Sequence, residues 1–273
     1  MQEYKLINFY INLDSANERR INIENNINKT NLNFIRYPAV IGNRLSNTTS
    51  NLTKSQLGCY FSHLQIINYC KDFDKDLLLI EDDEDFDETA NSIPEIINNI
   101  DRDSWDIIYL DATIVEVFDY LLIVRSILSN LKSNNKISPL LIDLNINSTI
   151  FGTHAYIVNK LSIDKLSKIL TNGLSLNKPI DNILSISIKQ GLLSAKLLTP
   201  TLFYPSINSI QSQISEREHP LMSDWLLFRN LISNKYLTDQ NNFNFSKIIK
   251  YEESIMKICT NRLKYSLIGE FTP

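Results

Sequence analysis

Five consecutive acidic residues that follow an apolar run carry the strongest chemical signal in the sequence. The run Leu78-Leu79-Ile80 leads directly into Glu81-Asp82-Asp83-Glu84-Asp85. A buried parallel strand delivers such residues at its carboxyl end, where open α/β sheets place their ligand crevice. Carboxylates this close repel one another, and a hard divalent cation that clamps a diphosphate would relieve the repulsion. From these residues alone, a solvated acidic turn after the strand is an equally good interpretation.

A second group of candidate residues lies near the N-terminus. Asn12, Leu13 and Asp14 end the first apolar run, and Arg19 follows in the next predicted helix. A loop after a first strand could hold a base and a ribose, and an arginine below it could reach a phosphate. Locally, an aspartate that caps a helix beside surface arginines is the simpler interpretation.

Other polar side chains belong to predicted helices or stand alone. His63 follows Gly58 in one helix, and a glycine inside a helix indicates a close backbone approach. His63 could bind a donor molecule, although its apolar neighbours favour a buried structural histidine. Asp181 opens another helix, where an aspartate is by default a cap, but its carboxylate could also reach the crevice. His154 and His219 are isolated, which favours structural roles, although a late histidine that completes a carboxylate metal site is chemically sensible.

The elements that would position these side chains alternate along the first two thirds of the chain. Apolar runs predict strands at residues 9–13, 33–40, 76–80, 106–111 and 155–158, and an extended segment at 197–204. Helical spacing predicts helices at 15–28, from a capping box at 53–56, from 94, and at 115–131, 161–170 and 181–190. This alternation predicts βαβ units around a largely parallel sheet, with 76–80 as a central strand buried on both faces.

The pattern changes near the C-terminus. After residue 220 the spacing of apolar residues is helical only, for example at 248–263. We therefore expect a catalytic domain at residues 1–215 and a helical C-terminal extension packed on it at residues 216–273.

Composition narrows the class of protein. The formal net charge is -4 and the pI is about 5.5, which argues against nucleic-acid binding because that needs a basic surface. The three cysteines lack zinc-site spacing and cannot all pair, which indicates buried thiols in a reducing compartment. The most apolar stretch, residues 120–124, is too short to span a bilayer, and the N-terminus lacks a signal-peptide pattern. We expect a cytoplasmic protein with at most peripheral contact with the inner face of the cytoplasmic membrane.

Several blocks, taken in order, resemble glycosyltransferase family 25, the lipooligosaccharide glycosyltransferases. The resemblance runs from residue 5 to about residue 215, and it favours a functional role for the acidic run. The blocks are Tyr10-Ile11-Asn12-Leu13-Asp14 with Glu18-Arg19-Arg20, Tyr37-Pro38-Ala39-Val40 with Gly42, Leu57-Gly58-Cys59-Tyr60-Phe61-Ser62-His63-Leu64, Leu79-Ile80-Glu81-Asp82-Asp83, Trp105-Asp106-Ile107-Ile108-Tyr109-Leu110, Ala155-Tyr156-Ile157-Val158 and Pro179-Ile180-Asp181.

This resemblance implies a fold and an activity. The fold would be of GT-A type, a Rossmann-like mixed sheet flanked by helices. The activity would be an inverting, Mn²⁺- or Mg²⁺-dependent sugar transfer. The donor would be a nucleotide sugar, UDP-galactose being the commonest. The acceptor would be a lipooligosaccharide or another glycan, including a lipid-linked one. Residues 112–153 lie outside the resemblance and would shape the acceptor site.

By position, the resemblance also implies the roles of single residues. The metal ligands would be Glu81, Asp82 and Asp83. The donor-binding residues would be Asn12, Leu13, Asp14, Arg19 and His63. The general base would be Asp181, and Asp111 is the next acidic residue to consider. Two other functions stay open: a catalytically silent donor-binding scaffold, and a metal-dependent phosphohydrolase that uses the same carboxylates.

Overall fold

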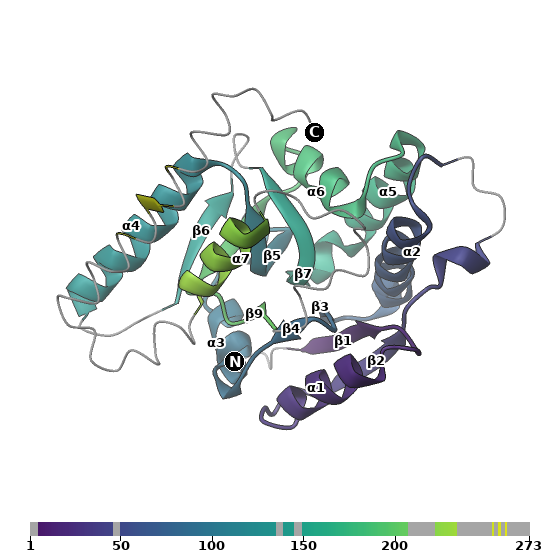
Figure 1. Ribbon diagram of the computed structural model, residues 1–273, viewed down its shortest axis with the longest axis horizontal. Helices are drawn as coiled ribbons and strands as arrows, with labels where there is room; N and C mark the ends of the chain where they lie inside the picture. Colours follow the sequence, from purple (N-terminus) through teal and green to yellow (C-terminus); the bar gives the residue numbers. More distant parts are fainter. Residues whose placement is uncertain are drawn as a thin grey trace.

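The computed structural model describes residues 5–45, 50–134, 139–144, 149–206 and 222–233, together with residues 253, 256, 257 and 260. Strands and helices alternate through most of the described chain (Figure 1). In chain order they are β1 Leu6–Asn12, α1 Asn17–Ile27, β2 Phe34–Pro38, α2 Lys54–Tyr69, β3 Asp76–Glu81, β4 Glu84–Asp85, α3 Ile93–Asn98, β5 Ile107–Ile114, α4 Val117–Asn134, β6 Leu140–Leu144, β7 Ile150–Val158, α5 Ile163–Gly173, α6 Ile180–Lys189, β8 Ala195–Thr199, β9 Tyr204–Pro205 and α7 Met222–Leu231.

Seven strands form one mixed sheet in the order β2-β1-β3-β7-β5-β8-β6. The pairs β1–β2, β1–β3 and β5–β8 are parallel, whereas β7 is antiparallel to both β3 and β5, and β6 is antiparallel to β8. The expectation of a largely parallel sheet is therefore wrong. After β5 the chain runs through α4 to the edge strand β6, and it returns as β7 in the middle of the sheet. The mixed sheet flanked by helices that the resemblance implied is confirmed.

The central strand β3 is buried on both faces, as its apolar sequence predicts. Leu77 and Leu79 belong to one core cluster, and Leu78 and Ile80 belong to the other. All four side chains are fully buried. Burying side chains of this size stabilises the fold by roughly 1.5–3 kcal/mol each, so the strand is held rigidly where it ends at Glu81.

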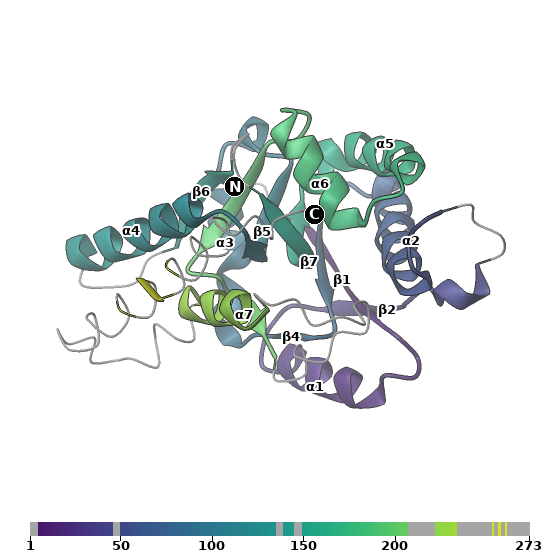
Figure 2. The ribbon, with the colours of Figure 1, turned by 45° about the horizontal axis from the view of Figure 1, so that its top comes forward.

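The helices are divided between these two cores. Residues of α2, α5 and α6 contribute to the first cluster, whereas Ile23 of α1 and residues of α3 contribute to the second. Figures 1 and 2 both show α2, α5 and α6 side by side and α1 apart from them. The predicted capping box is confirmed: the Thr53 side chain accepts a hydrogen bond from the Gln56 backbone, and the Gln56 side chain accepts one from the Thr53 backbone.

Two strands differ from their predictions. No strand was predicted at β6, an edge strand whose apolar run, Leu140-Leu141-Ile142, is short and only half-buried. The strand predicted at 155–158 begins earlier, at Ile150. The prediction missed its first half because this half contains Gly152, Thr153 and His154 and is polar. These residues border the site described below.

Helix α7 packs on β5 and β9. Phe228, Leu231 and Ile232 join the first core cluster. The expected domain boundary at 215 and His219 lie outside the described residues, as does most of the helix predicted at 248–263. The division into two domains stays a prediction.

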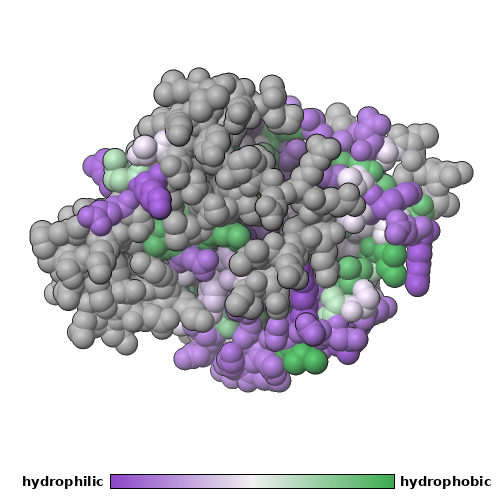
Figure 3. All heavy atoms as spheres, viewed as in Figure 1, coloured by the Kyte–Doolittle hydropathy of each residue, from purple (hydrophilic) through white to green (hydrophobic). Residues whose placement is uncertain are grey.

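Part of the described surface is polar. Figure 3 shows mostly hydrophilic residues along the lower edge of the molecule, where Figure 1 draws α1. Among the described residues, no helix combines the length and the apolar character needed to cross a membrane.

Candidate active site

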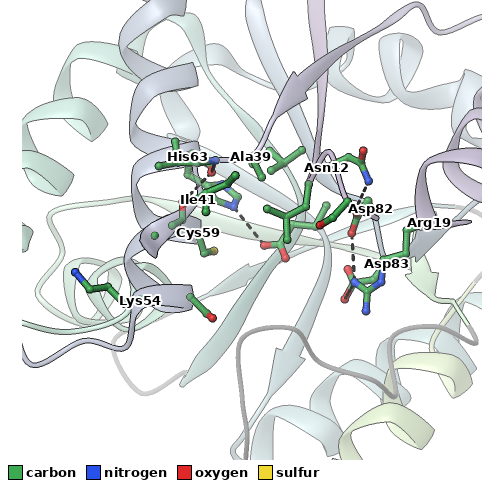
Figure 4. A pocket seen from close by; sticks show the side chains of 18 of the residues that line it. Asn12, Arg19, Ala39, Ile41, Lys54, Cys59, His63, Asp82 and Asp83 are labelled. Carbon is green, nitrogen blue, oxygen red and sulfur yellow. Dashed lines mark hydrogen bonds and ion pairs between the residues drawn. The ribbon is translucent and has the colours of Figure 1, made fainter. Parts of the chain in front are cut away.

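A pocket of about 310 Å³ opens where β1 and β3 end. Its walls come from the end of β1, from residues 39–43, from the first turns of α2 and from Glu81, Asp82 and Asp83 after β3. Figure 4 shows Lys54, Cys59 and His63 on one side and Asn12, Arg19 and Asp82 on the other. This size is at the lower end of the range typical of small-molecule sites.

Gly58 explains how α2 comes so close to this pocket. A Cβ atom at Gly58 would lie 2.4 Å from the carbonyl oxygen of Val40. Only glycine therefore allows α2 to lie this close to the backbone of Val40 and Gly42. The predicted close backbone approach is confirmed.

Asp82 is held by residues from β1 and α1. Asn12 Nδ2 donates a hydrogen bond of 2.6 Å to Asp82 Oδ2, and Arg19 Nη1 donates one of 3.3 Å to Asp82 Oδ1. Asn12 is itself fixed, because Arg36 Nε donates to its Oδ1 at 3.1 Å. Both carboxylate oxygens of Asp82 thus already have protein partners. Its predicted role as a metal ligand stays a prediction.

The remaining donor-side residues take different positions. Leu13 lines the pocket. Asp14 is not among the lining residues; its exposed carboxylate accepts a 2.6 Å hydrogen bond from Arg36. No observation ties the Asp14 side chain to the pocket.

Glu81, Asp83 and His154 form a group that could hold a cation. One ligand atom from each lies within 4.8 Å of the others. Asp83 Oδ1 is buried without a hydrogen-bond partner. Burial and the neighbouring charge of Glu81 raise the pKa of Asp83 to about 7. Burial, together with the positive charge of Arg229, lowers the pKa of His154 to about 4, so its ring is neutral and can bind a metal.

Gly152 makes room for the His154 ring. Its φ is +82°, and a Cβ atom there would lie 2.2 Å from His154 Nε2. Two carboxylates and an imidazole are ligands that suit Mn²⁺, and the carboxylates also suit Mg²⁺. The residues present therefore fit the implied cation.

Glu81 is oriented by two other side chains. Thr153 Oγ1 donates a 2.6 Å hydrogen bond to Glu81 Oε1, and His63 Nε2 lies 3.3 Å from the same oxygen. Burial opposes the charge of Glu81, but His63 and Thr153 stabilise it and lower the pKa of Glu81 to about 2. The other ring nitrogen of His63, Nδ1, lies 2.8 Å from the Tyr156 hydroxyl. His63 is thus a buried residue that contacts Glu81 from the pocket wall.

A second, sealed group of charges lies behind the first. Arg229 of α7 donates hydrogen bonds of 2.7 Å to Glu84 Oε1 and 2.9 Å to Asp111 Oδ2. Burial alone would raise the pKa of Asp111, but the charge and hydrogen bonds of Arg229 lower it. Burial and the charge of Asp111 raise the pKa of Glu84. Asp111 is fully buried in this ion pair, which makes it a poor candidate for a general base.

Asp181 lies in the first turn of α6 but does not cap it. The N-cap residue is Pro179. Asp181 Oδ2 instead accepts a 3.1 Å hydrogen bond from the backbone N–H of Gly152, and Oδ1 accepts one of 2.8 Å from Asn182. Burial raises the pKa of Asp181 despite these bonds, and the charge of Glu81 raises it further. Asp181 is therefore not the N-cap residue, although Oδ1 accepts the backbone N–H of Asn182 in the first turn. Its carboxylate also lies near that of Glu81.

Sequence reasoning missed one residue of this region and undervalued another. For His154 it favoured a structural role and gave a place in a carboxylate metal site as the alternative. Arg229 was not singled out, although a charged residue among Leu226, Phe228 and Leu231 is a usable signal, because a charge in an apolar helical pattern needs a buried partner.

One of the comparisons with known proteins identifies a family. The sequence profile described as Glycosyltransferase family 25 (LPS biosynthesis protein) matches residues 5–184. Among solved structures, a Bacillus anthracis protein described as a glucose-1-phosphate thymidylyltransferase, in complex with a sucrose, is 12% identical with a TM-score of 0.35. The match covers 74% of this chain and 72% of that chain, and at this TM-score it carries no weight. A search of curated proteins finds no match. The family match includes Glu81, Asp83, His154 and Asp181, and it ends before Arg229.

Proposed function

The chain belongs to glycosyltransferase family 25, and we propose that it transfers a sugar from a nucleotide-sugar donor to a glycan hydroxyl with inversion and with the help of a divalent cation. The family membership makes it a glycosyltransferase. The observation that supports the finer proposal is the approach of Glu81, Asp83 and His154 to within 4.8 Å of one another beside the pocket.

The cation would be Mn²⁺ or Mg²⁺, held by Glu81, Asp83 and His154. When bound, such an ion would stabilise the negative charge of the departing nucleoside diphosphate. The chain contributes the ligands in a buried and oriented state: Thr153 and His63 fix Glu81, and Gly152 leaves space for His154. Asp82 would support the site indirectly, by holding Asn12 and Arg19 at the pocket wall.

The donor would occupy the pocket between the end of β1 and the start of α2. Asn12, Leu13, Arg19 and His63 line it, which supports the donor-side roles that the resemblance implied for them. Arg19 is the residue best suited to a phosphate, since its guanidinium lies beside Asp82 and Asp83 at the cation end of the pocket. UDP-galactose is our first choice of donor, because it is the commonest in the family.

Asp181 would be the general base. A carboxylate must take the proton of the attacking acceptor hydroxyl, and it does so best when its pKa is closer to the working pH. The raised pKa of Asp181 and its position beside Gly152 support this role. We propose a lipooligosaccharide or another lipid-linked glycan as acceptor, on the strength of the family description, with at most peripheral contact with the membrane.

A panel of nucleotide sugars, incubated with Mn²⁺ and with or without truncated lipooligosaccharide acceptors, tests this proposal. We expect one sugar to appear in the acceptor, with the opposite anomeric configuration by NMR, and nucleoside diphosphate to form only when acceptor is present. Cleavage of the donor at the same rate without acceptor would identify a hydrolase. Donor binding, measured as a thermal shift, without turnover on any acceptor would favour a silent scaffold.

A further inference from the structure

We propose that Cys59, His63 and Glu81 form a second cation site, which takes a thiol-binding divalent ion such as Zn²⁺. One ligand atom from each residue lies within 4.8 Å of the others. Cys59 and His63 are four residues apart on α2, so both project from the same face of the helix. Figure 4 shows both side chains on the pocket side of α2, and all three residues line the pocket.

The His63 ring is placed to bind an ion. Its side chain is only 1% exposed, and Nε2 has no hydrogen-bond partner although it lies 3.3 Å from Glu81 Oε1. The other nitrogen, Nδ1, is 2.8 Å from the Tyr156 hydroxyl. Histidines that bind metals typically have one ring nitrogen on the ion and the other fixed by a hydrogen bond. His63 is held in this way, and an ion bound between Nε2 and Glu81 would replace their direct contact.

The charges around Cys59 favour a cation as well. The carboxylates of Glu81, Asp181 and Asp83 all act electrostatically on the Cys59 sulfur. When an ion binds, the sulfur–metal bond replaces the S–H bond and the proton leaves to solvent, with no change in oxidation state.

The ligand types separate this site from the neighbouring group. Thiolate and imidazole ligands suit Zn²⁺, and three protein ligands would leave a fourth position open toward the pocket. Glu81, Asp83 and His154 offer no sulfur. Because Glu81 belongs to both groups, the two sites are not independent. The Zn²⁺ site requires no transfer activity, so it can exist even if the proposed function is wrong.

Co²⁺ titration of the full-length, reduced and metal-free chain tests the site, because a thiolate bound to Co²⁺ adds a charge-transfer absorption band that oxygen and nitrogen ligands do not give. We expect the band in the wild-type chain and its loss when Zn²⁺ is added. The band should be absent in Cys59→Ser and unchanged in the matched control Cys70→Ser, which alters a buried cysteine at the end of the same helix. Cys259→Ser is a further control, with the band also retained.

Zn²⁺ affinity, measured by competition with a chromophoric chelator, gives a second readout. Loss of a supporting hydrogen bond costs a metal site about 10- to 100-fold in affinity, so Cys59→Ala and His63→Ala should each weaken binding by about 100-fold or more. Circular dichroism must show that each variant folds. A wild-type chain without the band, or a band that persists in Cys59→Ser, would overturn the proposal. Loss of transfer activity with the band intact would instead count against the proposed function alone.

Discussion

Two groups of carboxylates lie on either side of the turn after β3, and the fold neutralises them differently. Glu84 and Asp111 are completely buried, and Arg229 contacts both at 2.7 and 2.9 Å. Glu81 and Asp83 have side chains that are 17% and 15% exposed. The Arg19 guanidinium lies 3.9 Å from the Asp83 carboxylate. The chain thus supplies its own cation to the sealed group and leaves the open group short of positive charge.

This difference indicates which carboxylates are structural and which are functional. A buried carboxylate without a counter-charge is costly, so it persists where something outside the chain compensates for it. Among the described residues, Asp83 Oδ1 in the open group has no hydrogen-bond partner, and neither do Glu84 Oε2 and Asp111 Oδ1 in the sealed group. The difference is that Asp83 lines the pocket, whereas Glu84 and Asp111 do not. The comparison leads to predictions that separate loss of activity from loss of stability.

The largest effect is expected from Asp83→Ala. This variant should abolish metal-dependent transfer, as should excess EDTA with the wild-type chain, because the cation loses a ligand. The melting temperature should fall little, since the substitution removes a buried charge that burial already disfavours. Transfer assays and thermal unfolding measured together check this. Full activity in the variant or in EDTA would rule out the cation site.

Asp181→Asn should come next, with a loss of about 10²- to 10⁴-fold in turnover, the usual contribution of a general base. Asparagine keeps an oxygen that accepts the N–H of Gly152 but cannot take a proton. Donor binding and the melting temperature should stay nearly unchanged. Turnover that survives would mean that Asp181 only supports β7 and α6.

Arg229→Met should destabilise the chain by about 3–5 kcal/mol, because two buried carboxylates would lose their partner. The matched control is Lys196→Met, whose partner Asp143 is 79% exposed, and it should cost about 1 kcal/mol or less. Urea unfolding gives both free energies. Equal effects of the two variants would contradict the distinction between a sealed and an open group.

Gly152→Ala should act on the open group through His154. The added methyl would collide with the His154 ring, and the φ of +82° would add strain of about 1–3 kcal/mol. Mn²⁺ affinity should fall about 10- to 100-fold, as for other residues that support a metal ligand. Gly191→Ala is the control, since its φ is +69° but no atom lies near the new methyl. It should show similar strain and unchanged Mn²⁺ affinity.

The sequence predicted the parts of this arrangement that local pattern determines. The apolar run before Glu81 located both the central strand and the open carboxylates, and the capping box located the start of α2. The sealed group depends on contacts between residues far apart in the chain. Arg229 reaches Glu84 and Asp111 only because α7 packs on β5, and His154 reaches Asp83 only because β7 returns antiparallel beside β3. No local pattern encodes either contact.

Mn²⁺ binding to the metal-free chain, followed by electron paramagnetic resonance, tests the central claim most directly. The wild-type chain should bind Mn²⁺, and Asp83→Asn should bind it about 100-fold more weakly or worse, since even supporting residues change metal affinity by 10- to 100-fold. Asp85→Asn alters the same acidic run outside the cation group, where Asp85 accepts a 2.8 Å hydrogen bond from Asn26, and it should bind like wild type. Equal affinities in all three chains would contradict a cation site at Glu81, Asp83 and His154.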